Sequence, residues 1–306
     1  MPVLSSAQYY LILVIFMRTV DSKRFICAER CEVVVCTLET CFADKIRTQE
    51  NARAVTILDN EMFILASPSS SELRIYDANS YTYRGAVQLS VRNVVGMVAC
   101  GFHHCLYIAD GDVSCIIRVE MPSKLRKWKV NDMDGKSVIS LTSSRCLLVV
   151  CPKANNLKLF STDGTLQSVV QLRPQIVNLT FAVELTPGKY VLSHGSGGDT
   201  LHRVCVVDDE GKILHIHGGL SGSYPTLLSC PGGIVVDKNG FVYVDDVSNQ
   251  RLIVLTPNLK YVQCLTGVFK QGYRRLSMDK ESGNVFVMYW YYTNFCYQYL
   301  TDFYEI

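Results

Sequence analysis

The sequence predicts an all-β protein, a six-bladed β-propeller of four-stranded antiparallel blades, and three observations lead to this prediction. Short runs rich in β-branched and aromatic residues alternate with turns of Gly, Asp, Asn and Pro along the chain. No segment keeps the 3.6-residue apolar period of an amphipathic helix. One five-residue apolar block recurs six times. Successive copies begin about 43 residues after one another, except at one longer step. A spacing of about 43 residues is the period of a blade repeat.

The recurring block is the second strand expected in each blade. The copies begin at Phe63, Leu106, Leu147, Tyr190, Val242 and Val285. An apolar strand and a polar turn precede the block. A third strand with a basic residue among aliphatic ones follows it, as in RLIVL (251–255), and a fourth strand closes the unit. A single sheet of this kind leaves both faces uncovered, and packing against the next copy around a ring covers them. The long step contains the Gly- and Ser-rich stretches 193–200 and 218–226, which we expect to be extended loops.

Two segments follow from the repeat length. Six units of about 43 residues fill residues 49–306, which we expect to be the propeller, and leave 1–48 as an N-terminal segment. The last copy ends short of a fourth strand, whereas EVVVCTL (32–38) reads as a strand without a blade. We hypothesise that this strand pairs into the last sheet and closes the ring.

The apolar run at 9–17 leaves three readings open. It is too short to cross a hydrocarbon core, which needs about 20 residues. No Lys or Arg precedes it, as one would in a secretory signal. A signal peptide, a buried strand and a remnant of the gene model therefore all stay open.

Composition excludes several classes of protein. A chain with 48% hydrophobic and 19% charged residues is not disordered. With 30 basic and 28 acidic residues the net charge is +2, so we expect neither DNA nor a membrane as partner. The 13 cysteines are an odd number and stand mostly in apolar runs, which predicts buried free thiols and a cytoplasmic location. Secretion is the lesser alternative.

The sequence gives little support for catalysis or a metal. It contains no nucleophile elbow, phosphate loop, HExxH or dinucleotide motif. Four cysteines lie early in the chain, at Cys27, Cys31, Cys36 and Cys41. Their spacing lacks the C-x2-C pairs that are typical of zinc sites. His215 and His217 could share one face of a strand, but that strand is a predicted outer one, so we expect solvated edge residues. The carboxylates expected on innermost strands are Glu184, Asp237 and Asp279. They do not recur in every blade, so they do not form a ring of carboxylates around the channel.

One passage resembles a known repeat. Residues 231–255 read PGGIVVDKNGFVYVDDVSNQRLIVL, with Pro and Gly before a strand ending in Asp, a Gly turn, a strand ending in Asp, and Asn-x-Arg. This order resembles the NHL repeat, and the matching positions are Pro231, Gly233, Asp237, Gly240, Tyr243, Asp246, Asn249, Arg251 and Leu252. Asp245 departs from the pattern, since it stands where the family has Ala. The copy at 106–119 matches less fully, and the others match in hydrophobic pattern only.

The polar residues of this motif have a structural interpretation. Asp246 and Arg251 stand five residues apart across a tight strand connection, where carboxylate and guanidinium can pair. Asn249 suits the turn because its side chain can bond the local backbone. The resemblance itself implies a propeller like those at the C-terminus of tripartite-motif proteins, which select targets for ubiquitin ligation. Residues 1–48 contain no RING, so we do not expect this chain alone to be a ligase.

The loops that precede the innermost strands form the predicted binding face, because connections from every blade meet there around the channel. The candidates are Arg53, Arg92, Asn93, Lys136, Asn178, Tyr273 and Arg274. Arg and Tyr are favoured anchors for a protein partner. Basic and aromatic side chains also suit single-stranded RNA, and plain solvated loops are the remaining reading. A second basic cluster, residues 124–129, reads as protection of a sheet edge.

The sequence therefore predicts a monomeric, non-catalytic scaffold that binds a protein partner and needs no cofactor. RNA binding through the same face is the first alternative. A lyase or lactonase with a metal in the channel is the second, and it would need His or carboxylate side chains that converge on the channel mouth.

Overall fold

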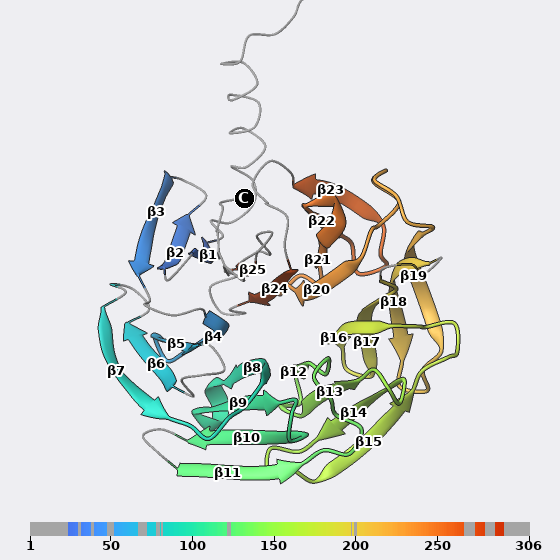
Figure 1. Cartoon of the computed structure of the whole chain (residues 1–306). Helices are drawn as coiled ribbons and strands as arrows, with labels where there is room; N and C mark the ends of the chain where they lie inside the picture. Colours follow the sequence, from blue (N-terminus) through green and yellow to red (C-terminus); the bar gives the residue numbers. More distant parts are fainter. Residues whose placement is uncertain are drawn as a thin grey trace, which may run out of the picture.

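The computed structural model shows a ring of β-sheets around a central axis (Figure 1). The backbone is described for residues 24–29, 32–37, 40–47, 52–66, 72–77, 80, 82–120, 124–196, 198, 201–265, 273–278 and 285–290. Side chains are described for a smaller set, which excludes strands β1 to β3. No helix in the described part of the chain is long and apolar enough to span a membrane. The apolar run at 9–17 lies outside the described residues.

Five sheets have four antiparallel strands each and follow the chain in order. The first contains β4 (Ala52–Leu58), β5 (Glu61–Ala66), β6 (Glu72–Asp77) and β7 (Tyr83–Gln88). The second contains β8 (Val94–Cys100), β9 (Cys105–Asp110), β10 (Cys115–Glu120) and β11 (Lys124–Lys129). The third contains β12 (Ile139–Leu141), β13 (Leu147–Cys151), β14 (Asn156–Phe160) and β15 (Leu166–Gln171).

The fourth sheet contains β16 (Leu179–Thr186), β17 (Lys189–His194), β18 (His202–Asp208) and β19 (Ile213–Gly219). The fifth contains β20 (Pro231–Val236), β21 (Val242–Asp246), β22 (Arg251–Leu255) and β23 (Tyr261–Leu265). Two short 3-10 helices, η1 (Gly101–His103) and η2 (Val247–Asn249), lie in strand connections. Each recurring block of the sequence forms the second strand of its sheet, as predicted.

The sixth sheet joins the two parts of the chain that are farthest apart in sequence. Its strand order is β24 (Tyr273–Met278), β25 (Val285–Trp290), β1 (Arg24–Glu29), β2 (Glu32–Thr37) and β3 (Thr40–Arg47). Strand β1 runs parallel to β25, with Phe25 opposite Val285. The closing strand expected at 32–38 is therefore present in the last sheet as β2. It pairs with β1, and β1 in turn pairs with β25.

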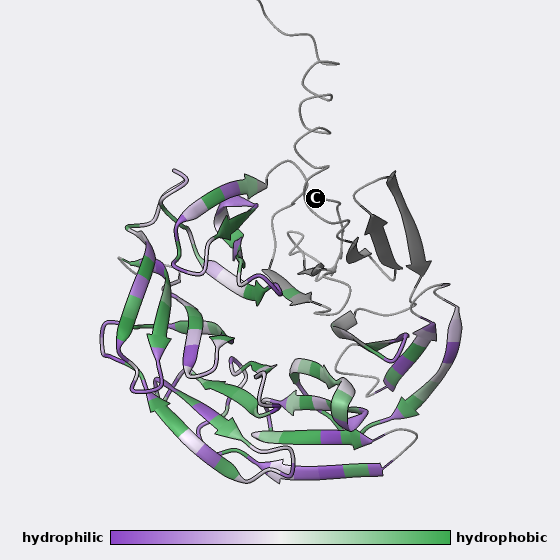
Figure 2. Cartoon of the chain, turned by 180° about the vertical axis from the view of Figure 1, so that it is seen from behind, coloured by the Kyte–Doolittle hydropathy of each residue, from purple (hydrophilic) through white to green (hydrophobic). Residues whose placement is uncertain are grey.

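Neighbouring sheets share their hydrophobic cores. Leu148 on β13 and Leu192 on β17 belong to one buried cluster that joins the third and fourth sheets. Tyr107 on β9 and Val149 on β13 belong to another that joins the second and third. Fully burying one such aliphatic side chain contributes about 1.5–3 kcal/mol. Figure 2 shows this distribution of hydropathy. The inner strands of the sheets are mainly hydrophobic, and hydrophilic residues lie at the connections and on the outer strands.

The described cysteines are free thiols, and several lie in these cores. Burial raises the pKa of Cys151 to about 11 and that of Cys205 to about 12. Thiols in this state are inert and pack as small apolar groups. The side chains of the early cluster between Cys27 and Cys41 lie outside the described residues.

Candidate functional site

The connections that enter the innermost strands lie on one rim of the ring, because every described blade runs through its strands in the same order. Arg92 and Lys136 precede β8 and β12 and are exposed, and Asn178, just before β16, is exposed as well. Asn93 is half-buried. The remaining candidates lie on innermost strands β4 and β24 with side chains outside the described set, and they are Arg53, Tyr273 and Arg274. Binding of one ligand by these residues stays a prediction.

The connection into β8 is held by a buried carboxylate. Asp110, the last residue of β9, accepts hydrogen bonds from the backbone N–H of Arg92 at 2.9 Å and of Asn93 at 3.2 Å. The Asn93 side chain donates to Asp112 at 3.0 Å. The exposed Arg92 side chain therefore stands on a fixed backbone.

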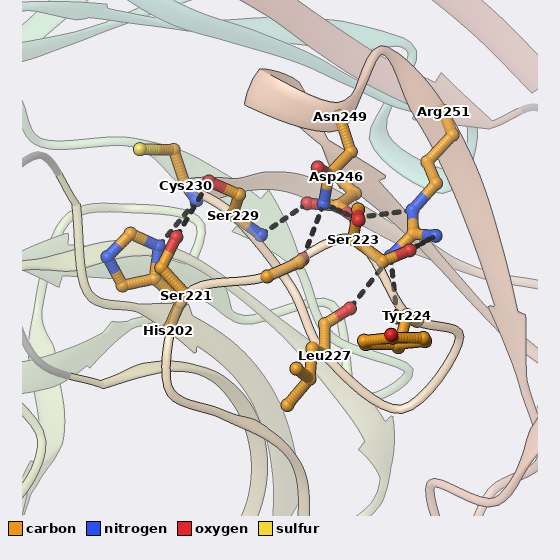
Figure 3. Close-up of polar contacts among 11 residues, drawn as sticks. His202, Ser221, Ser223, Tyr224, Leu227, Ser229, Cys230, Asp246, Asn249 and Arg251 are labelled. Carbon is orange, nitrogen blue, oxygen red and sulfur yellow. Dashed lines mark hydrogen bonds and ion pairs between the residues drawn. The ribbon is translucent and has the colours of Figure 1, made fainter.

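The connection into β20, residues 220–230, is held by a larger network that Figure 3 shows in close-up. Asp246 and Arg251 form the ion pair expected from their spacing, with 2.6 Å between Oδ2 and Nε. The Asp246 side chain is 0% exposed and that of Arg251 is 7% exposed. Asp246 is the last residue of β21 and Arg251 the first of β22, so the pair joins the two ends of the η2 turn at one side of the connection.

Arg251 uses its remaining nitrogens on the connection itself. Nη1 donates to the carbonyl of Ser223 at 2.6 Å. Nη2 donates to the carbonyls of Tyr224 at 3.0 Å and Leu227 at 2.8 Å. The planar guanidinium thus binds three backbone carbonyls and a carboxylate at once, which a lysine ammonium with three donors could not do.

Two further residues of the motif complete the network. Asn249 donates from Nδ2 to Asp246 at 2.7 Å and to the carbonyl of Gly222 at 2.9 Å. The Asp246 carboxylate also accepts from the backbone N–H of Ser229 at 2.6 Å. The local partner of the Asn249 side chain is therefore the Asp246 carboxylate and not the local backbone that the sequence predicted, and its backbone partner lies 27 residues back in the chain.

A buried imidazole fixes the end of the same connection. His202 accepts a hydrogen bond at Nδ1 from the backbone N–H of Cys230 at 2.7 Å. Leu228 is fully buried beside these bonds, whereas Tyr224 is 74% exposed and Leu220 is 66% exposed. The connection is therefore ordered from within and presents two large apolar side chains to solvent.

Residues 220–230 are not among the binding candidates that the sequence predicts, and residues 218–226 are expected only as an extended loop. The available signal was the single long step of the repeat, with Leu220 and Tyr224 among Gly, Ser and Pro. The three carbonyl contacts of Arg251 had no signal, since any residue offers a backbone carbonyl.

The other matched motif residues shape turns and close packing. Asp237 accepts at 2.9 Å from the backbone N–H groups of both Asn239 and Phe241, and Tyr243 donates its hydroxyl to Asp237 at 3.3 Å. Gly240 has φ +82°, a conformation that favours glycine. Further members sit at the start of β20, where Pro231 is its first residue and a Cβ on Gly233 would lie 3.0 Å from the nitrogen of Leu276.

The expectation that His215 and His217 are both solvated edge residues was wrong. His215 is exposed on β19, as expected, but His217 is buried at 7% exposure. Burial lowers the pKa of His217, and the backbone of Leu259 and Pro225 lies against it. Connection 220–230 and the turn after β22 cover this part of the outer strand, so the residue is not a solvated edge histidine.

The two described carboxylates of the predicted innermost-strand set, Glu184 and Asp237, accept hydrogen bonds from backbone N–H groups. Glu184 is buried and accepts from the N–H of Ser143, which ties the third sheet to the fourth. Asp237 caps the turn described above, and Asp279 lies outside the described residues. Within the described residues no three His, Cys, Asp or Glu side chains lie close enough together to hold a metal ion.

Comparisons with known proteins place the fold. No protein-family model and no curated protein matches the chain. Among solved structures, U3-55K is 12% identical with a TM-score of 0.63, over 91% of this chain and 90% of that one. A catalytically inactive virginiamycin B lyase from Staphylococcus aureus is 11% identical with a TM-score of 0.61, over 92% and 94%. The Swd1 β-propeller domain from Myceliophteria thermophila is 13% identical with a TM-score of 0.58, over 90% and 98%.

The chain is a β-propeller. Its structural relatives include proteins named as lyases and proteins whose names state no reaction. Identities this low establish the fold alone, and function is a property of sites placed on a fold. The NHL repeat stays a resemblance.

Proposed function

We propose that this propeller is a non-catalytic scaffold that binds a protein partner through the rim formed by the connections into its innermost strands. The observation that carries the proposal is connection 220–230. It is held by buried polar groups and exposes Tyr224 and Leu220.

This arrangement has the properties of a protein-binding surface. Tyr is among the residues most often responsible for binding energy at interfaces. A loop already ordered in the free protein loses little conformational entropy on binding, which raises affinity. Arg251 and Asn249 donate hydrogen bonds to the backbone carbonyls of connection 220–230 and so stabilise the loop that presents Leu220 and Tyr224.

The proposed partner is a protein, and selection of a target for ubiquitin ligation is the finer proposal that the NHL resemblance suggests. The lyase or lactonase alternative has less support. The carboxylates of Glu184 and Asp237 already accept backbone hydrogen bonds, which leaves them poorly suited to acid–base chemistry.

The experiment is a comparison of partners captured in cells by the full chain and by a Leu220→Ser/Tyr224→Ser variant. Leu166→Ser, which removes an apolar side chain that is 49% exposed on outer strand β15, is the matched control. We expect the control to retain the partners and the double variant to lose them. Loss of an aromatic anchor worth about 2 kcal/mol lowers affinity about 30-fold. Identical partners for all three chains would contradict the proposal.

RNA is the second candidate, favoured by the exposed Arg92 and Lys136 on successive connections of the same rim. Its test is a titration with short single-stranded RNAs at two salt concentrations. Binding that weakens steeply with salt and is lost in Arg92→Ala/Lys136→Ala would favour RNA, because phosphate contacts release counterions. Absence of binding at low salt would eliminate it.

A further inference from the structure

A pair of thiols and an imidazole lie together on the opposite rim, where β8 turns into β9. Cys100 is the last residue of β8 and Cys105 the first of β9, and they are direct cross-strand partners. The Sγ of Cys100 lies 3.3 Å from Nδ1 of His103, which stands in the η1 turn between them.

We propose that Cys100 and Cys105 form a reversible disulfide, with Cys100 as the thiol that reacts first with a small peroxide oxidant. The proposal concerns a modification site and is independent of the rim proposed above for partner binding.

The backbone geometry suits the bond. Directly opposed residues of antiparallel strands have Cα atoms about 4.5–5.5 Å apart. Disulfides bridge Cα atoms about 4.4–6.8 Å apart. The strands therefore need no large movement to bring the sulfurs into bonding distance, as they would for two cysteines on different blades.

The surroundings make the two thiols unequal. Hydrogen bonds from Cys105 and then His103 lower the pKa of Cys100 against the opposing effect of burial. The hydrogen bond to Cys100, together with burial, raises the pKa of Cys105. Because the thiolate is the nucleophile, Cys100 attacks and Cys105 resolves.

Access is through the η1 turn. Cys100 is 4% exposed and Cys105 is fully buried, but Gly101, Phe102 and His104 of the turn are exposed. A molecule as small as hydrogen peroxide can reach a sulfur at the base of such a turn, whereas a bulky reagent cannot. The turn is braced by Arg145, whose guanidinium lies 3.3 Å from the centroid of the Phe102 ring.

The chemistry balances with hydrogen peroxide as the oxidant. The Cys100 thiolate attacks one peroxide oxygen, an S–O bond forms and the O–O bond breaks, and the departing hydroxide takes up a proton to become water. Cys105 then attacks the sulfenic sulfur, an S–S bond forms and the S–O bond breaks, and a second water leaves with the Cys105 proton. Two thiols are oxidised by two electrons and one peroxide is reduced to two waters. A small thiol reverses the bond by exchange.

The first experiment treats the full chain with hydrogen peroxide, alkylates the remaining thiols and maps the peptides by mass. We expect a Cys100–Cys105 link that dithiothreitol removes, while Cys151 and Cys205 stay reduced. In Cys105→Ser the reaction should stop at a sulfenic acid on Cys100, which dimedone labels when the oxidised chain is unfolded in its presence. In Cys100→Ser it should not start at Cys105. Oxidation of Cys151 as fast as Cys100, or linkage of Cys100 to another cysteine, would overturn the proposal.

The second experiment tests His103 as a positioning residue. Each unit by which the Cys100 pKa rises above the working pH lowers the thiolate fraction tenfold, and the gain in nucleophilicity recovers about threefold. Measured at a pH below the pKa of Cys100, His103→Gln should therefore slow sulfenic acid formation by about threefold per pKa unit, and it should shift the pH–rate profile to higher pH with an unchanged melting curve. An unchanged profile in a folded His103→Gln chain would remove His103 from the proposal.

Discussion

Truncation of Arg251 tests the network that orders connection 220–230. The Asp246 carboxylate is 0% exposed, and Arg251→Ala removes its counterion but leaves the donors from Ser229 and Asn249. Removing one partner of a buried ion pair costs about 3–5 kcal/mol. The two remaining donors place the expected cost at the lower end, about 3 kcal/mol. The three released carbonyls can turn to water, so they add little to this figure.

The assay is urea unfolding followed by circular dichroism, with limited chymotrypsin digestion as a local readout. Cleavage after the exposed Leu220 should become faster in Arg251→Ala, because three of the bonds that hold this connection are gone. Arg84→Ala is the matched control. Arg84 is 49% exposed and pairs with Asp77 and Glu61 at the surface, and such pairs contribute less than about 1 kcal/mol.

A second substitution separates the charge from the contacts. Asp246→Asn in the Arg251→Ala background removes the unpaired buried charge while retaining an oxygen that can accept from Ser229. This double variant should be more stable than Arg251→Ala alone. Equal losses for Arg251→Ala and Arg84→Ala, or a double variant less stable than the single one, would refute the reasoning.

Three further outcomes are expected. Burial lowers the pKa of His217 below its ordinary value near 6.5, so the unfolded chain binds the proton more readily. Stability should therefore fall as pH drops from about 6.5 toward the lowered folded-state pKa, by at most about 1.4 kcal/mol per unit, and urea titrations of His217→Gln should lose this slope. Deletion of residues 1–40 should lower the melting temperature, because β1 no longer covers the edge of β25, and an unchanged melting curve would count against closure. Gly164→Ala should destabilise the third sheet in a thermal melt, since its φ is +94° and a Cβ would lie 2.8 Å from the Trp128 ring, whereas Gly101→Ala, at a glycine with open space, should not.

The sequence by itself determined the strands, their order and the ring. These features depend on alternation and turn residues within a few positions, repeated at a nearly constant step. The Asp246–Arg251 pair was predictable for the same reason, since five residues across one connection bring the two side chains together. Closure by an N-terminal strand was predictable from the missing fourth strand of the last copy, whereas the structure places three N-terminal strands, β1, β2 and β3, in that sheet.

Only the tertiary structure decided what surrounds these elements. The carbonyls that Arg251 binds lie 24–28 residues back in the chain, and a backbone carbonyl has no sequence signature. His217 is buried because a neighbouring connection crosses its strand, although alternation alone predicts an exposed edge. The Cys100–Cys105 pair needed the register of β8 against β9, which depends on the length of a turn. In each case a long-range contact, set by packing between segments, assigned the role that local pattern could not.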